Sequence, residues 1–243
     1  MIKFFRKIRY NLMETGKTGK YFKYAIGEII LVMIGILLAL QVNNWNENKK
    51  TKHTEVFVLK EVLNNLNEDA TILNDIINQR LKTKVSIANM LVYLQEETIN
   101  KDTLEKDLVN YMTFERYFPI NNAYEILKSK GLQLSNNSLT TKISRYYDFE
   151  QKKINRSILD VENAILNVLE NPSGIIQYVE SIELNKKVSI INSNDPNLKH
   201  DLNRNLVAFK HNNIGTLDKL IVFNKLNKSL RNSIETELKL IGI

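Results

Sequence analysis

Hydrophobic residues beyond residue 55 recur at intervals of three and four positions in three long stretches. The stretches cover residues 55–95, 139–168 and 198–238. Such spacing places the apolar side chains on one face of an α-helix. The opposite faces are rich in Lys, Glu, Asn and Asp, as is typical of helices that are buried on one side only. The pattern therefore predicts an all-α fold in which long amphipathic helices cover one another's apolar faces in an elongated bundle.

Turn-forming residues are scarce and fall between these stretches. The chain holds only 8 Gly and 3 Pro in 243 residues. Gly131 follows a short helical pattern and is expected to cap that helix in the left-handed conformation. Asn171-Pro172 predicts the end of the second long helix, and the polar sequence around Pro196 predicts a turn. Gly215 is a candidate break in the third long helix.

The amino-terminal part has a different pattern, an unbroken apolar run. Between Ala25 and Val42 the only charged residue is Glu28. Leu, Ile and Val fill eleven of these eighteen positions and contribute about −3 to −7 kcal/mol to membrane insertion, whereas a carboxylate at mid-bilayer costs about 2.5–3.5 kcal/mol. Residues 21–45 are therefore predicted to form a transmembrane helix, with Trp45 as an aromatic anchor at the far interface.

Charge on the two sides of this run predicts its orientation. Residues 1–23 carry seven basic side chains and one acidic one. The positive-inside rule therefore places the amino terminus in the cytoplasm and residues 46–243 outside it. The long basic region and the lack of a small-x-small cleavage site favour an uncleaved signal anchor over a signal peptide. Residues 1–20 are expected to form a basic amphipathic segment that either lies on the inner leaflet or only sets the topology.

The distribution of charge along the chain indicates which partners to expect. The chain carries +7, and residues 1–23 account for +6 of it, which leaves +1 for the remainder. A nearly neutral body with a basic head predicts no nucleic-acid partner and attraction to the anionic headgroups of a lipid bilayer. The absence of cysteine excludes disulfides, thiolate catalysis and cysteine-ligated metals.

Residues with catalytic or metal-binding chemistry show no recognised motif. No two of the three histidines have the helical spacing of a metal site; they are His53, His200 and His211. Four acidic residues on the first long helix are interpreted as its solvated face: Glu61, Glu68, Asp69 and Asp75. The sequence therefore predicts no enzyme activity, no metal site and no cofactor.

Aromatic residues are concentrated in the middle of the chain. Eight of the twenty lie between residues 111 and 149: Tyr111, Phe114, Tyr117, Phe118, Tyr124, Tyr146, Tyr147 and Phe149. They are interpreted either as core packing between crossing helices or as the lining of a ligand pocket. In a pocket, Arg116, Lys128 and Arg145 would be candidates for binding an anion.

Two long segments carry a resemblance to a known family. They are "MIKFFRKIR" with "YAIGEIILVMIGILLALQVNNWNE", and "FPINNAYEILKSKGLQLSNNSLTTKISRYYDF". Both resemble an uncharacterised domain-of-unknown-function family of single-pass inner-membrane proteins from Bacteroidota-type bacteria. The resemblance implies an inner-membrane anchor with a helical domain in the periplasm. It implies no activity, ligand or catalytic residue.

Two functions are compatible with these patterns. The first is a membrane-anchored scaffold for protein–protein interaction or sensing, and the alternative is an envelope enzyme or small-ligand binder that uses residues 111–149. Glu28, Gly35 and Ala39 share one side of the transmembrane helix, where a second copy or another membrane protein could approach closely. Glu28 could instead extend toward the cytoplasmic headgroups.

Overall fold

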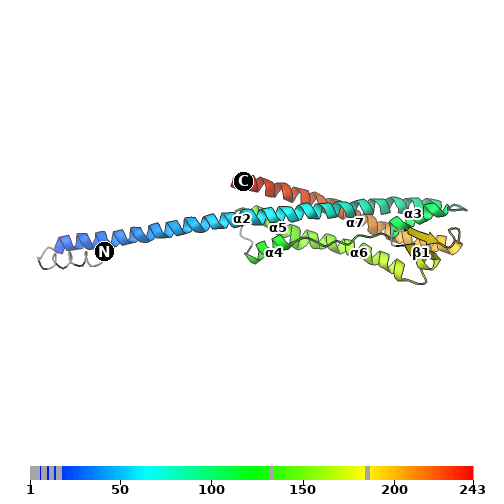
Figure 1. Cartoon of the computed structure of the whole chain (residues 1–243), viewed down its shortest axis with the longest axis horizontal. Coiled ribbons are helices and arrows are strands. Elements are labelled where there is room, and N and C mark those ends of the chain that lie inside the picture. The colour runs from blue at the N-terminus through cyan, green and yellow to red at the C-terminus, as the bar shows by residue number, and fades with distance from the viewer. Residues whose placement is uncertain are drawn as a thin grey trace. The chain divides into compact units, whose positions relative to one another are not determined.

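The computed structural model describes residues 6, 10, 14, 18–131, 134–183 and 187–242 (Figure 1). It divides into two compact units, Met1–Glu55 and Val56–Ile243. Most of the described chain is helical, which confirms the all-α prediction. The amphipathic segment predicted for residues 1–20 falls largely outside the described residues.

The first unit contains the amino-terminal part of helix α2 (Thr18–Tyr93). Large hydrophobic side chains along this part, from Phe22 to Trp45, are each between 51% and 67% exposed. Its most apolar window has a mean hydropathy of 2.4 and buries none of its residues in the protein. This helix is long and apolar enough to cross a membrane.

The second unit contains the rest of the secondary structure. Its elements after α2 are α3 (Lys101–Met112), α4 (Asn122–Ser129), α5 (Asn137–Arg145), the π-helix η1 (Tyr146–Glu150), α6 (Gln151–Glu170), the 3-10 helix η2 (Ile175–Tyr178), β1 (Val179–Glu183), β2 (Lys187–Ile190) and α7 (Pro196–Ile241). Helices α5, η1 and α6 follow one another without a gap and form the second predicted stretch. Helices α6 and α7 pack side by side, and the hairpin lies at the end where α6 leads into α7 (Figure 1).

Helix ends fall where the sequence predicts them. Gly131 follows α4 with a φ of 79°, the left-handed conformation expected of it. The second long helix ends at Glu170, with Asn171 as its C-cap. The predicted turn before Pro196 closes with a helix cap, because the Asp195 carboxylate accepts a hydrogen bond from the Asn197 backbone N–H at 2.8 Å. These local signals therefore set the lengths of α4, α6 and α7.

Two details differ from the sequence-based expectation. Helix α7 continues through Gly215, so the predicted break is wrong. A glycine inside a helix costs only about 1 kcal/mol, and the buried side chains of Asn213, Thr216 and Leu217 hold this part of α7 in the core. The second difference is the β1–β2 hairpin, whose strands are too short to show a clear alternating pattern. Its Ile190 N–H donates to the Glu105 carboxylate of α3 at 2.8 Å.

Helices α2 and α7 run antiparallel, and hydrogen bonds from two buried asparagines of α7 to α2 define their register. The Asn227 side chain donates to the Leu66 carbonyl at 3.0 Å, and the Asn213 side chain donates to the Arg80 carbonyl at 3.2 Å. On each helix the two contact points are fourteen residues, or two heptads, apart. Both asparagines are fully buried. Polar residues at core positions of this kind specify the register of paired helices.

Two apolar cores lie along this helix pair. The first contains Leu66, Tyr146 and Phe223, and the second contains Met90, Tyr111 and Leu206. Between them lies a buried polar layer, which we define as Arg80, Thr83, Asn213 and Thr216. In this layer the Thr83 hydroxyl donates to the Asn110 carbonyl of α3 at 2.8 Å. Polar contacts therefore hold α3 and α7 against the carboxy-terminal part of α2.

Removing one register contact should weaken the fold measurably. Asn227→Ala deletes the hydrogen bonds to the Leu66 carbonyl and the Tyr146 hydroxyl, and we expect a loss of about 1–3 kcal/mol of unfolding free energy. Asn224→Ala is the matched control, because Asn224 lies one turn away and makes an exposed contact with Asn74; its effect should stay within about 0.5 kcal/mol. Urea unfolding followed by circular dichroism measures both, and equal losses would contradict this role for Asn227.

Candidate functional site

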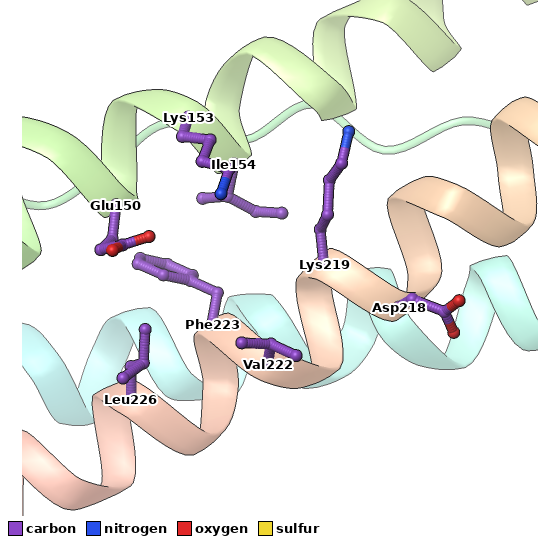
Figure 2. A pocket seen from close by; sticks show the side chains of 8 residues that line it. All are labelled: Glu150, Lys153, Ile154, Asp218, Lys219, Val222, Phe223 and Leu226. Carbon is purple, nitrogen blue, oxygen red and sulfur yellow. The ribbon is translucent and has the colours of Figure 1, made fainter.

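An open groove between α6 and α7 has both apolar and charged walls. It consists of two adjoining cavities of about 260 and 470 Å³. We call it the α6–α7 groove and define it by Lys142, Arg145, Tyr146, Glu150, Lys153, Ile154, Asp218, Lys219, Val222, Phe223, Leu226, Ser229 and Leu230. Figure 2 looks into the smaller cavity, with α6 and α7 as its walls.

The floor of the groove is apolar. Phe223 and Ile154 are buried between the two helices, and Phe223 stacks on Tyr146 with ring centroids 4.8 Å apart. Val222 and Leu226 lie one turn apart on α7 and are 57% and 40% exposed. Although the sequence assigns Leu226 to the apolar stripe of its helix, here its side chain lines the groove (Figure 2). The groove therefore presents apolar surface to solvent.

The rim of the groove carries more cations than anions. Four basic side chains surround it, Lys142, Arg145, Lys153 and Lys219, against two acidic ones, Glu150 and Asp218. Arg145 pairs with Glu150 at 3.4 Å. Among the described residues no ion pair engages the three lysines. Two of them contact hydroxyl groups, since Lys142 donates to Ser233 at 3.4 Å and Lys219 donates to Ser157 at 3.1 Å.

The π-helix η1 forms part of one groove wall. A π turn adds a residue to a helical turn, and such turns are frequent at functional sites. Here η1 buries Tyr146 and Tyr147 and leaves Phe149 57% exposed. The Lys153 ammonium lies 6.0 Å from the centre of the Phe149 ring. The exposed Phe149 ring thus lies next to Lys153, which lines the groove.

A buried carboxyl lies directly behind the groove. Asp69 of α2 is 1% exposed and accepts hydrogen bonds from Tyr117 at 2.7 Å, Tyr146 at 3.2 Å and Gln151 at 3.3 Å. We call these four residues the Asp69 cluster. Burial raises the pKa of the Asp69 carboxyl, and hydrogen bonds from these side chains and from the Ile120 backbone offset this only in part. Tyr146 belongs to both the cluster and the groove, so it connects the two.

The sequence-based interpretation of Asp69 as a solvated residue is wrong. Glu68 and Asp75 are exposed and Glu61 is partly exposed, as expected of a polar face. Asp69 instead follows Leu66 by three positions and precedes Leu73 by four. It therefore occupies a core position of the apolar stripe, and this spacing is the signal that could have identified it.

The eight central aromatic residues separate into three groups. Tyr117, Tyr124, Tyr146 and Tyr147 belong to the first core. Tyr124 and Tyr147 stack with ring centroids 4.7 Å apart. Tyr111 belongs to the second core, against which Phe114 also packs. Phe118 and Phe149 are largely exposed. The structure thus brings four of the eight together as core packing.

The three cations proposed for an anion site each have an acidic partner. Arg116 pairs with Glu162 at 2.7 Å. Lys128 pairs with Asp148 at 3.1 Å. Arg145 pairs with Glu150 and lies at the α6–α7 groove. These pairs do not line one shared pocket, so of the three only Arg145 belongs to the candidate site.

Residues proposed for helix association lie on the part of α2 in the first unit. Gly35 and Ala39 are exposed, and Glu28 is partly exposed. A Cβ atom added at Gly35 would meet nothing within 4 Å. The surface around Gly35 is therefore open to close approach by another helix.

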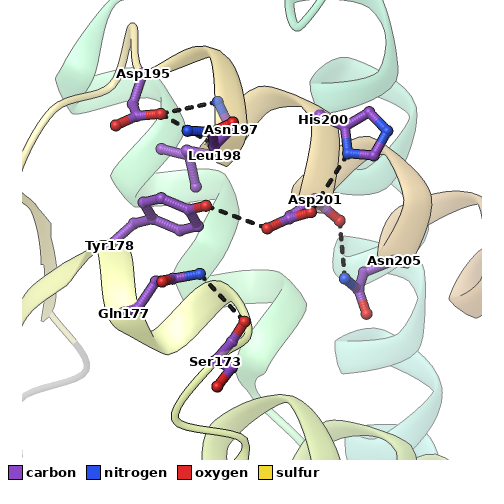
Figure 3. A network of polar contacts seen from close by, with 9 residues as sticks. All are labelled: Ser173, Gln177, Tyr178, Asp195, Asn197, Leu198, His200, Asp201 and Asn205. Atoms are coloured by element: carbon purple, nitrogen blue, oxygen red, sulfur yellow. Dashed lines mark hydrogen bonds and ion pairs between the residues drawn. The ribbon is translucent and has the colours of Figure 1, made fainter.

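A second polar site lies at the amino-terminal end of α7 (Figure 3). The Asp201 carboxylate accepts a hydrogen bond from the Tyr178 hydroxyl at 3.1 Å and lies 3.4 Å from the His200 ring. Beside it is a polar cavity of about 250 Å³, lined in part by Asn167, Arg204 and Asn205. Within the part of the chain that the structure describes, no three His, Asp or Glu side chains are grouped to hold a metal.

A model of a known protein family matches residues 28–200. The matched family is DUF6090, a family of unknown function. The chain belongs to DUF6090. Neither the curated proteins nor the solved structures match it. The DUF6090 match contains most of the apolar run and the α5–α6 wall of the groove, while the α7 wall lies beyond its end.

The raised pKa of Asp69 predicts a pH-dependent stability. At pH values between the ordinary and the raised pKa, the folded chain retains the Asp69 proton and the unfolded chain loses it. The stability that this group contributes is therefore greatest at low pH and is lost as pH rises through the raised pKa. Asp69→Asn removes this titration, so the wild type should lose stability relative to the variant as the pH rises from the ordinary pKa of 3.8 to the raised pKa. Urea midpoints across this range measure the difference, and parallel curves would contradict it.

Proposed function

We propose that this DUF6090 protein is a single-pass inner-membrane protein whose helical domain lies in the periplasm and binds another protein. In this proposal the apolar part of α2 is an uncleaved signal anchor and the amino terminus is cytoplasmic. The observation that carries the proposal is that the apolar window of α2 buries none of its residues in the protein. The protein would act as an interaction or sensing scaffold and not as an enzyme.

The exposed apolar helix supports the membrane part of the proposal. Burying one Val, Leu or Ile side chain is worth about 1.5–3 kcal/mol, and α2 leaves a continuous series of such side chains without a protein core. A lipid bilayer would cover this apolar surface along the length of the run. The basic excess before the run supports a cytoplasmic amino terminus.

The second unit supports a binding role. Its buried carboxyl, Asp69, is engaged by three internal donors. Five of the eight central aromatics are packed in the two cores, which gives little support to an envelope enzyme or small-ligand site in residues 111–149. The α6–α7 groove instead offers exposed apolar side chains within a charged rim, the composition of a protein-binding surface.

Substitution in the apolar run tests the anchor. Ile34→Arg places a cation near the centre of the run, where insertion is disfavoured by about 2.5–3.5 kcal/mol. We expect alkali to extract part of the Ile34→Arg variant from the membrane, whereas the matched control Ile34→Ala should stay in the membrane fraction. Carbonate extraction followed by immunoblotting measures the two fractions. A wild type recovered in the soluble fraction would overturn the anchor.

Topology is tested by access of a protease to intact spheroplasts. The proposed orientation exposes residues 46–243 at the outer face of the inner membrane, so proteinase K should degrade the carboxy-terminal domain without detergent. A cytoplasmic control protein must stay intact in the same sample. Protection of the domain until the membrane is dissolved would contradict the orientation.

The membrane helix is also proposed to associate with another helix, in a second copy or another membrane protein. Gly35→Leu fills the open surface beside Gly35 and should lower the yield of crosslinked complex several-fold, because small residues permit close helix approach. Gly27→Leu is the matched control, since Gly27 has equally open surroundings and lies about 80° from Gly35 around the helix. Crosslinking in native membranes measures the yield; monomer alone from the wild type would refute the association.

A further inference from the structure

We propose that the α6–α7 groove binds an acidic amphipathic helix of a partner protein. The inference rests on the proposed binding role and names the surface and the chemistry of the partner. Its basis is the combination of length, exposed apolar floor and basic rim in one open groove.

The groove has the length of a short helix. One wall extends over residues 142–154 and the other over residues 218–230. At a rise of about 1.5 Å per residue, each wall is about 18 Å long, which equals slightly more than three helical turns. A helix of that length presents apolar anchors at positions i, i+3, i+4 and i+7. The groove can therefore accept one apolar face of a three-turn helix.

The side chains of Val222 and Leu226 in the groove floor are exposed to solvent. Another side of α7 packs on α2, where Asn227 contacts the Leu66 carbonyl, and Figure 2 shows α2 behind α7. A helix laid over Val222 and Leu226 would join α2, α6 and α7 in a four-helix arrangement. Helices commonly pack in this way, with the ridges of one in the groove between others.

Charge at the rim selects an acidic partner. Lys142, Lys153 and Lys219 surround the apolar floor and have no carboxylate partner among the described residues. Carboxylates flanking the apolar face of an incoming helix would lie beside these ammonium groups. Complementary rim charges give binding its specificity and speed its association.

Openness of the groove favours a helix over a lipid chain. Val222 remains 57% exposed, so a ligand lying on it would have its outer side in water. An amphipathic helix keeps a polar face there, whereas an acyl chain is apolar on all sides. The chain's own residues 1–23 carry a charge of +6 and would be repelled by the basic rim.

Site-specific photocrosslinking tests the proposal in the full-length protein. Benzoylphenylalanine is introduced at Val222 and, as a matched control, at Val85 of α2, because these valines are 57% and 59% exposed. Cells of the source organism are irradiated, and the crosslinked peptide is sequenced by mass spectrometry. We expect Val222 to capture a partner segment with apolar residues at helical spacing and flanking Asp or Glu, and Val85 not to capture that segment.

Charge reversal separates groove binding from general attraction. Lys153→Glu with Lys219→Glu should lower the Val222 crosslink at least tenfold. Lys210→Glu with Lys228→Glu makes the same charge change at exposed positions of α7 that do not line the groove, and should leave the yield unchanged. Equal circular dichroism spectra of the purified variants establish that both pairs fold.

Other outcomes overturn the proposal. A Val222 crosslink to lipid, to a second copy of this chain or to a basic or uncharged segment would do so. An equal loss of crosslink yield in both charge-reversal pairs, or no crosslink at Val222, would do so as well. The carbonate and protease experiments report on the anchor independently. If they succeed and the crosslink fails, the acidic-helix inference is lost while the membrane anchor stands.

Discussion

The antiparallel register of α2 and α7 is the constraint on which the second unit depends. Buried amides at Asn213 and Asn227 donate to backbone carbonyls of α2 at points two heptads apart. A shift by one residue would leave both amides buried without these acceptors, which is costly inside a core. Asn227 also donates to the Tyr146 hydroxyl of η1, which in turn donates to Asp69. The same α7 helix places Val222 and Leu226 in the groove. One pairing thus places both the buried cluster and the exposed surface.

Tyr146 contacts both the buried Asp69 cluster and the α6–α7 groove. Its ring lines the groove and stacks on Phe223, while its hydroxyl contacts both Asp69 and Asn227. Burial and the nearby Asp69 carboxyl raise the pKa of the Tyr146 hydroxyl, so it stays protonated and acts as a donor. A neutral hydroxyl, and not an exposed charge, therefore connects the groove floor to Asn227, which sets the register of α2 and α7.

Features that depend on neighbouring residues could be predicted from the sequence. The helical stripes, the left-handed Gly131 and the stop at Asn171 depend on local spacing and turn chemistry, and the structure has all three. The residue type of Asp69 favours a solvated position, whereas its place in the apolar stripe predicts its burial. Leu226 has core spacing but lies in the groove, since periodicity does not reveal whether another helix covers a face. The groove itself depends on how α6 and α7, distant in sequence, pack together.

The polar layer of Arg80, Thr83, Asn213 and Thr216 has a consequence for how the second unit opens. Apolar contacts within each core are extensive, yet the two cores are joined at this layer mainly by hydrogen bonds. Proteins open locally in contiguous cooperative units of different stability, and we expect this layer to be the boundary between two such units. The hairpin end can then open for hydrogen exchange while the groove end stays closed. Backbone amides of α2 and α7 on the two sides of the layer then differ in their protection from exchange.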